Sequence, residues 1–150
     1  MAAVDGITEL QKAIFNYLWT QNNDFKTACP GGVHYDELPR DEDLTYPCCF
    51  YFFVSAIKDR DSCSKHLDAI IQFDFKDESI DSSQNKISST RLSGVMAEFD
   101  ERFNDCEDSL IMTNFKAITV DDIDLGADPP RKSIAKRWEG RRTYRIQLDR

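Results

Sequence analysis

The chain has 150 residues, of which 41% are hydrophobic, and its 27 acidic and 19 basic side chains give a formal charge of −8. This length and composition predict a single folded domain over 1–150 with its own core, and they exclude a largely disordered chain. The longest apolar run, over 48–54, is far shorter than the roughly 20 residues of a membrane helix, and we expect no signal peptide. The negative charge argues against general duplex-DNA binding, which depends on neutralised phosphates.

Hydrophobic periodicity predicts seven elements along the chain. In order, they are a helix over 7–20, strands over 33–38, 48–57 and 67–76, a helix over 82–104, and strands over 110–123 and 141–148. Asp5 is the expected cap of the first helix. A long loop is expected over about 124–138, followed by a turn at Glu139 and Gly140. Gly94 interrupts the second helix, and a close helix–sheet contact would explain it.

The order α-β-β-β-α-β-β indicates an α/β (α+β) fold. The three strands before the second helix are joined by short loops, which favours antiparallel pairing. Two helices can cover one face of such a sheet. We therefore expect a two-layer sandwich, with two helices on a mostly antiparallel sheet of four to five strands.

The net charge conceals an asymmetry along the chain. Residues 131–150 hold eight basic and two acidic side chains, a balance of +6, whereas residues 1–130 hold the other 11 basic and 25 acidic side chains, a balance of −14. A basic segment on an acidic body has three physical interpretations. It contacts nucleic acid, it pairs with its own body, or it pairs with the acidic body of an identical neighbour.

The five cysteines give no metal-binding or disulfide pattern. There is no C-x-x-C, and Cys63 with His66 forms one C-x-x-H without a second ligand pair. We expect reduced thiols that act as small hydrophobic side chains. No phosphate-binding loop or nucleophile motif is present, so we predict no enzyme activity, no catalytic residues, no metal and no cofactor.

The most function-like local feature is Trp138 within a run of basic residues. Arg and Trp are enriched at binding hot spots, and an aromatic ring among cations can also stack on single-stranded nucleic acid. Equally, such a Trp can pack over the sheet edge while its neighbours face water. For a subunit or partner interface, the candidate residues are Lys136, Arg137, Trp138, Arg141 and Arg142, with Asp41, Glu42 and Asp43 as an acidic patch.

The order of these elements over roughly residues 5–149 resembles the small tail-terminator, or tail-completion, proteins of long-tailed bacteriophages. The matching pieces are a glycine turn at Gly31 and Gly32 into 33–36, Tyr46-Pro47 before the hydrophobic stretch 48–54, the strand 71–77, and the closing Trp138-Glu139-Gly140 and 143–146. The resemblance lies in their order rather than in any single motif.

The resemblance implies a structural role with no catalytic residues. Such proteins form a hexameric ring on the head-proximal end of the tail tube, stop its polymerisation and join it to the neck. The expected partners are therefore further copies of the chain, the tail tube protein and a neck or connector protein, with double-stranded DNA passing through the lumen and no membrane. The expected location is the virion, after assembly in the host cytoplasm. A neck or stopper protein is the alternative, and a small nucleic-acid-binding module is a third hypothesis.

Overall fold

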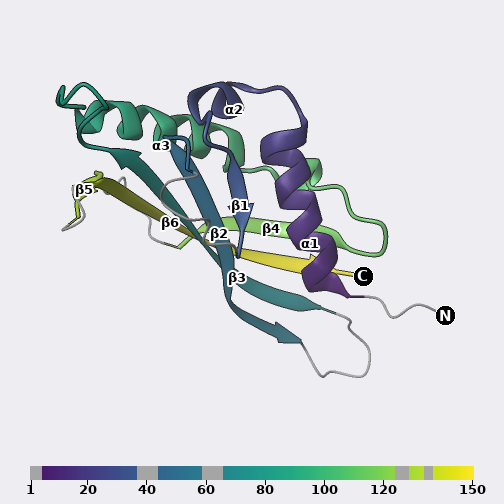
Figure 1. The fold of residues 1–150 in the computed structure, drawn as a ribbon. Helices are drawn as coiled ribbons and strands as arrows, with labels where there is room; N and C mark the ends of the chain where they lie inside the picture. Colours follow the sequence, from purple (N-terminus) through teal and green to yellow (C-terminus); the bar gives the residue numbers. More distant parts are fainter. Residues whose placement is uncertain (1–4, 37–43, 59–65, 124–128, 134–136) are drawn as a thin grey trace.

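The computed structural model describes residues 5–36, 44–58, 66–123, 129–133 and 137–150 (Figure 1). The helical elements are α1 (Gly6–Phe15), which continues into the π-helical turn η1 (Asn16–Thr20), α2 (Asp24–Ala28), α3 (Ser89–Phe103) and the 3-10 turn η3 (Glu107–Ser109). The strands are β1 (Val33–Tyr35), β2 (Cys48–Lys58), β3 (Leu67–Glu78), β4 (Lys116–Asp122), β5 (Arg131–Lys132) and β6 (Arg137–Asp149).

Six strands form one sheet in the order β1-β2-β3-β6-β4, and β5 pairs with β6. All neighbours are antiparallel except β1 and β2, which are parallel. The expected mostly antiparallel α+β fold is therefore confirmed, but antiparallel pairing of the first two strands was wrong. The reason lies where the two strands begin, because Gly31 N–H donates to the Pro47 carbonyl at 2.8 Å and Cys49 N–H donates to Gly32 at 2.9 Å.

The helices cover one face of the sheet, and the core lies between these two layers (Figure 1). Along β3, buried and half-buried residues alternate, as strand geometry requires. The buried set meets α3 and β6 in a cluster of contacting aromatic rings: Phe25, Tyr51, Phe73, Phe75, Phe99, Phe103 and Tyr144. Apart from Ile70, the other face of β3 and β6 carries polar and charged side chains.

The second predicted helix begins seven residues later than expected. Its cap is Ser88, whose hydroxyl accepts from Thr90 N–H. Before it, the Asp81 carboxylate accepts from Ser83 N–H and Asn85 N–H, and Gln84 has a positive φ of 64°. These local bonds close a turn that competes with the helix.

Other predictions were wrong in detail. The short helix α2 was not expected; the Asn23 side chain caps it at Lys26 N–H. Strand β6 runs without interruption through Glu139 and Gly140, where a turn was predicted. β5 lies within the expected long loop, and β4 is shorter than predicted. Gly94 is exposed, with nothing within 4 Å of a Cβ built there, so the helix–sheet contact proposed for it is absent.

Candidate subunit interface

The pairing of β6 with β3 brings arginines of the basic segment beside aspartates, one directly opposite and one diagonally. Arg141 lies opposite Asp74, and its Nε lies 3.3 Å from the Asp74 carboxylate. Arg145 pairs with Asp68 on the same face, and Arg145 Nε donates to Asp68 Oδ1 at 2.9 Å. The hydrogen bond from Arg145 lowers the pKa of Asp68. The polar face of the sheet therefore carries two arginines whose charge is matched within the chain.

Arg142 lies on the opposite face of β6, between the sheet and α3. Its side chain is only 4% exposed, and its Nε donates to Asp100 Oδ1 of α3 at 3.0 Å. A second guanidinium nitrogen donates to the Arg141 carbonyl at 3.1 Å. Arg142 thus joins helix to sheet within the subunit. For Arg141, Arg142 and Arg145, pairing with the chain's own body is the interpretation that the structure shows.

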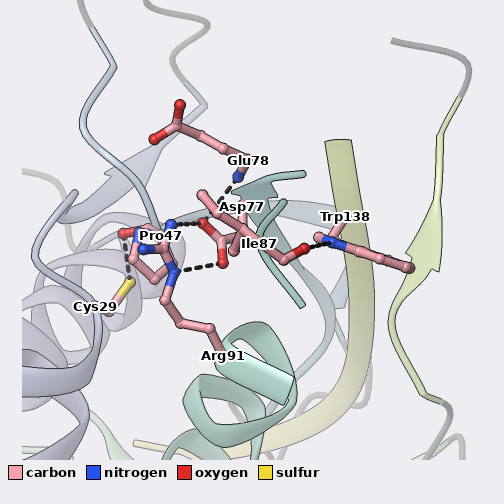
Figure 2. Close-up of polar contacts among 7 residues, drawn as sticks. All are labelled: Cys29, Pro47, Asp77, Glu78, Ile87, Arg91 and Trp138. Atoms are coloured by element: carbon pink, nitrogen blue, oxygen red, sulfur yellow. Dashed lines mark hydrogen bonds and ion pairs between the residues drawn. The ribbon is translucent and has the colours of Figure 1, made fainter. Parts of the chain in front are cut away.

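Trp138 anchors the segment that precedes α3. Its indole Nε1–H donates to the Ile87 carbonyl at 2.9 Å, and the ring is half-buried (Figure 2). Next to it along β6, the Arg137 guanidinium lies over the Tyr46 ring, 5.6 Å from its centroid. Both side chains therefore have structural contacts within the subunit.

An ion pair between a buried carboxylate and a partly exposed arginine fixes the same corner of the fold. Asp77, fully buried near the end of β3, accepts hydrogen bonds from Arg91 of α3 and from Glu78 N–H at 2.8 Å (Figure 2). Hydrogen bonding to Asp77 raises the pKa of Arg91. Because a buried carboxylate without a partner is costly, this pair holds the start of α3 against the sheet.

A cleft of about 540 Å³ opens at this end of the sheet. It is lined by Asp74, Phe75, Lys76, Pro129, Arg131, Glu139, Gly140 and Arg141. Cations outnumber carboxylates in it by three to two, counted over those lining residues. Its position on exposed strands suits contact with another macromolecule rather than an enclosed small-molecule site.

The described cysteines Cys29, Cys48, Cys49 and Cys106 are free thiols, all buried. Burial raises the pKa of each thiol, to about 12 for Cys48 and Cys106. Over the described residues, no group of three or more His, Cys, Asp or Glu side chains could hold a metal ion. None of the described helices combines the length and the apolar character needed to cross a bilayer.

The predicted site residues are only partly assembled. Arg137, Trp138 and Arg141 lie at one end of the sheet, Arg142 is inside the subunit, and Lys136, Asp41, Glu42 and Asp43 lie outside the described residues. Contact of Arg137, Trp138 and Arg141 with a second subunit stays a prediction. Arg131, which also borders the cleft, was not among the predicted interface residues.

The fold is similar to that of a protein of solved structure. The chain is similar to a chain in the virion of a native gene transfer agent (GTA) particle, with a TM-score of 0.69. The likeness covers 99% of this chain and 100% of that one at 9% sequence identity, so it shows a shared fold over the full length. No protein-family model and no curated protein sequence matches the chain.

Proposed function

We propose that this chain is a structural protein of a phage-like virion, without catalytic activity. The observation that carries the proposal is the full-length fold likeness to a chain of a gene transfer agent virion. The likeness covers nearly all of both chains, so neither carries a large insertion relative to the other. This supports a subunit of the same general shape. The order of sequence elements, which resembles tail-terminator proteins, supports the same class independently of the structural comparison.

Within that class, we propose a ring that caps the head-proximal end of the tail tube, stops its growth and joins it to the neck. A ring needs a heterologous interface, in which one patch meets a different patch on the next copy. The chain supplies unlike charges for such an interface, because the basic segment keeps exposed cations at Arg131 and Lys132 while residues 1–130 carry a balance of −14.

The polar face of the sheet is suited to a channel that DNA crosses. Duplex DNA binds tightly where basic side chains replace its counterions. On this face, Asp68 and Asp74 neutralise Arg145 and Arg141. Such a surface tolerates passing phosphates without holding them. The same pairing leaves fewer cations for a nucleic-acid-binding module, so assembly is the better-supported function.

The experiment that tests the ring is native mass spectrometry of the purified chain, with negative-stain microscopy of the same sample. We expect one closed oligomer, a hexamer, with a central opening. A chain that stays monomeric at high concentration and forms no rings contradicts the proposal. Specific duplex-DNA binding with a steep salt dependence would favour the nucleic-acid module instead.

A further inference from the structure

The short hairpin of β5 and β6 carries two basic side chains, Arg131 and Lys132, that form no ion pair among the described residues. Arg131 lies opposite Glu139, Lys132 lies opposite Trp138, and Ser133 N–H closes the pairing by donating to the Arg137 carbonyl at 2.7 Å. Figure 1 shows β5 at the end of the sheet far from the C-terminus. Both basic side chains are exposed, and neither makes an ion pair with any residue that the structure describes.

These two cations differ from three arginines of the basic segment that lie on β6. Arg141, Arg142 and Arg145 are already matched by carboxylates of their own subunit. Arg131 instead borders the open cleft at the end of β3 and β6. The positive charge at Arg131 and Lys132 is therefore available to pair with carboxylates of a partner.

The chain offers a matching surface elsewhere. A second cleft, of about 390 Å³, lies between α2 and α3 and is bordered by Asp24, Glu98 and Glu101. Its one cation, Arg102, is engaged by its own subunit, because it lies 3.9 Å from the centre of the Tyr17 ring and donates to the Tyr17 carbonyl at 2.8 Å. The three carboxylates make no ion pair with the described residues.

The two surfaces cannot meet within one copy. The hairpin lies beside the end of β3, where Arg91 of α3 contacts Asp77, whereas Glu98 and Glu101 lie two to three turns further along α3. From Arg91 to Glu101 the helix rises by roughly 15 Å. A basic surface and a distant acidic surface on the same chain are the two halves of a heterologous contact.

We propose that Arg131 and Lys132 of one copy dock in the α2–α3 cleft of the next copy, against Asp24, Glu98 and Glu101. The proposal rests on the ring proposed above and assigns its interface to residues other than the buried Arg142. The charge pairs set the register of the contact and speed encounter, so association weakens as salt screens them.

The test is a charge-swap series measured by analytical ultracentrifugation and native mass spectrometry of the full chain. One variant carries Arg131→Glu and Lys132→Glu, a second carries Glu98→Lys and Glu101→Lys, and a third combines all four changes. A variant with Lys12→Glu and Lys86→Glu is the control, because it changes net charge as much as the first variant at exposed positions away from both clefts. Thermal unfolding of each variant checks that it folds.

We expect each double variant to self-associate at least roughly tenfold more weakly than wild type, and the fourfold variant and the control to associate as wild type does. Mixing the two double variants should also restore association. The acidic hairpin of the first variant then meets the basic cleft of the second, and the basic hairpin of the second meets the acidic cleft of the first. If wild type forms rings and the charge-reversed variants form them equally well, the proposed interface is wrong but the proposed ring is supported. If wild type forms no oligomer, the proposed ring and the proposed interface are both wrong. The proposal is also overturned if the variant with Arg131→Glu and Lys132→Glu loses binding to duplex DNA but self-associates as wild type does.

Discussion

Gly140 of β6 faces Met96 of α3 so closely that a Cβ at Gly140 would lie 2.2 Å from the Met96 sulfur. Met96 is 1% exposed, so its side chain has little room to give way. Helix and sheet therefore approach closely at Gly140, where the sequence carries a residue with no side chain. The glycine serves packing here, since its φ is not positive.

We expect Gly140→Ala to destabilise the fold by about 1–3 kcal/mol through overpacking. Urea unfolding gives the value. Gly94→Ala is the matched control, because Gly94 lies exposed in α3 with open space around it, and there we expect a gain of up to about 1 kcal/mol from helix propensity. Met96→Ala opens a cavity and is itself destabilising, but in that background the further loss from Gly140→Ala should be smaller than in wild type. Equal effects at the two glycines would contradict the close contact.

The Arg142–Asp100 pair gives a second prediction. Arg142→Met removes the charge but keeps much of the side-chain volume, leaving Asp100 without its partner, so we expect a loss of about 3 kcal/mol in unfolding free energy. Arg141→Met, at a side chain that is 65% exposed, should change the stability by less than about 1 kcal/mol. Unchanged monomer stability together with weakened self-association would instead make Arg142 an interface residue.

The pairing of Asp68 with Arg145 predicts a pH dependence. In the folded chain, the pKa of Asp68 is lowered from its ordinary 3.8. A carboxylate with a lowered folded-state pKa stabilises the fold above its unfolded-state pKa, and this contribution disappears as the pH falls through the folded-state pKa. Asp68→Asn should therefore be less stable than wild type near neutral pH, and the difference should shrink below about pH 4.

Urea unfolding across that pH range checks it, with Asp108→Asn, at an exposed position in η3, as the control. A difference between Asp68→Asn and wild type that grows towards acid would have the opposite sign and would contradict the pairing.

Burial of the thiols predicts that they react slowly with disulfide reagents. Cys63 lies outside the described residues, so the measurement uses Cys63→Ser. In this variant we expect none of the remaining four thiols to react with a disulfide reagent at the rate of a free cysteine, because they are buried and their pKa values are raised. Full reaction should follow addition of urea. A thiol that reacts at once in the native protein would show that one of these side chains is accessible.

Much of the fold could be predicted from local patterns. The alternation of Ile71, Phe73 and Phe75 placed β3 correctly, because one face of that strand is buried against helices and the other is polar. The parallel pairing of β1 could not be predicted in this way, since it depends on the distant contact of Gly31 with Pro47. The turn expected at Glu139 and Gly140 was overridden by pairing with β3 and by the Met96 contact.

The site was harder to predict than the fold. The sequence grouped Arg141 with Arg142 by charge, although neighbouring residues of a strand face opposite sides. The alternation that buries Tyr144, Ile146 and Leu148 already places Arg142 on the inner face, so this signal was present. The choice of Asp100 as its partner was not visible, because it depends on how α3 lies across the sheet.

The most direct measurement of the proposed role is electron microscopy of the purified chain mixed with tail tubes of its own particle. We expect a ring on one end of each tube and shorter tubes when the chain is present during polymerisation. Binding along the tube wall, or binding only to DNA-filled heads and not to tubes, would contradict a cap on the tail, and the latter would identify a neck or stopper protein.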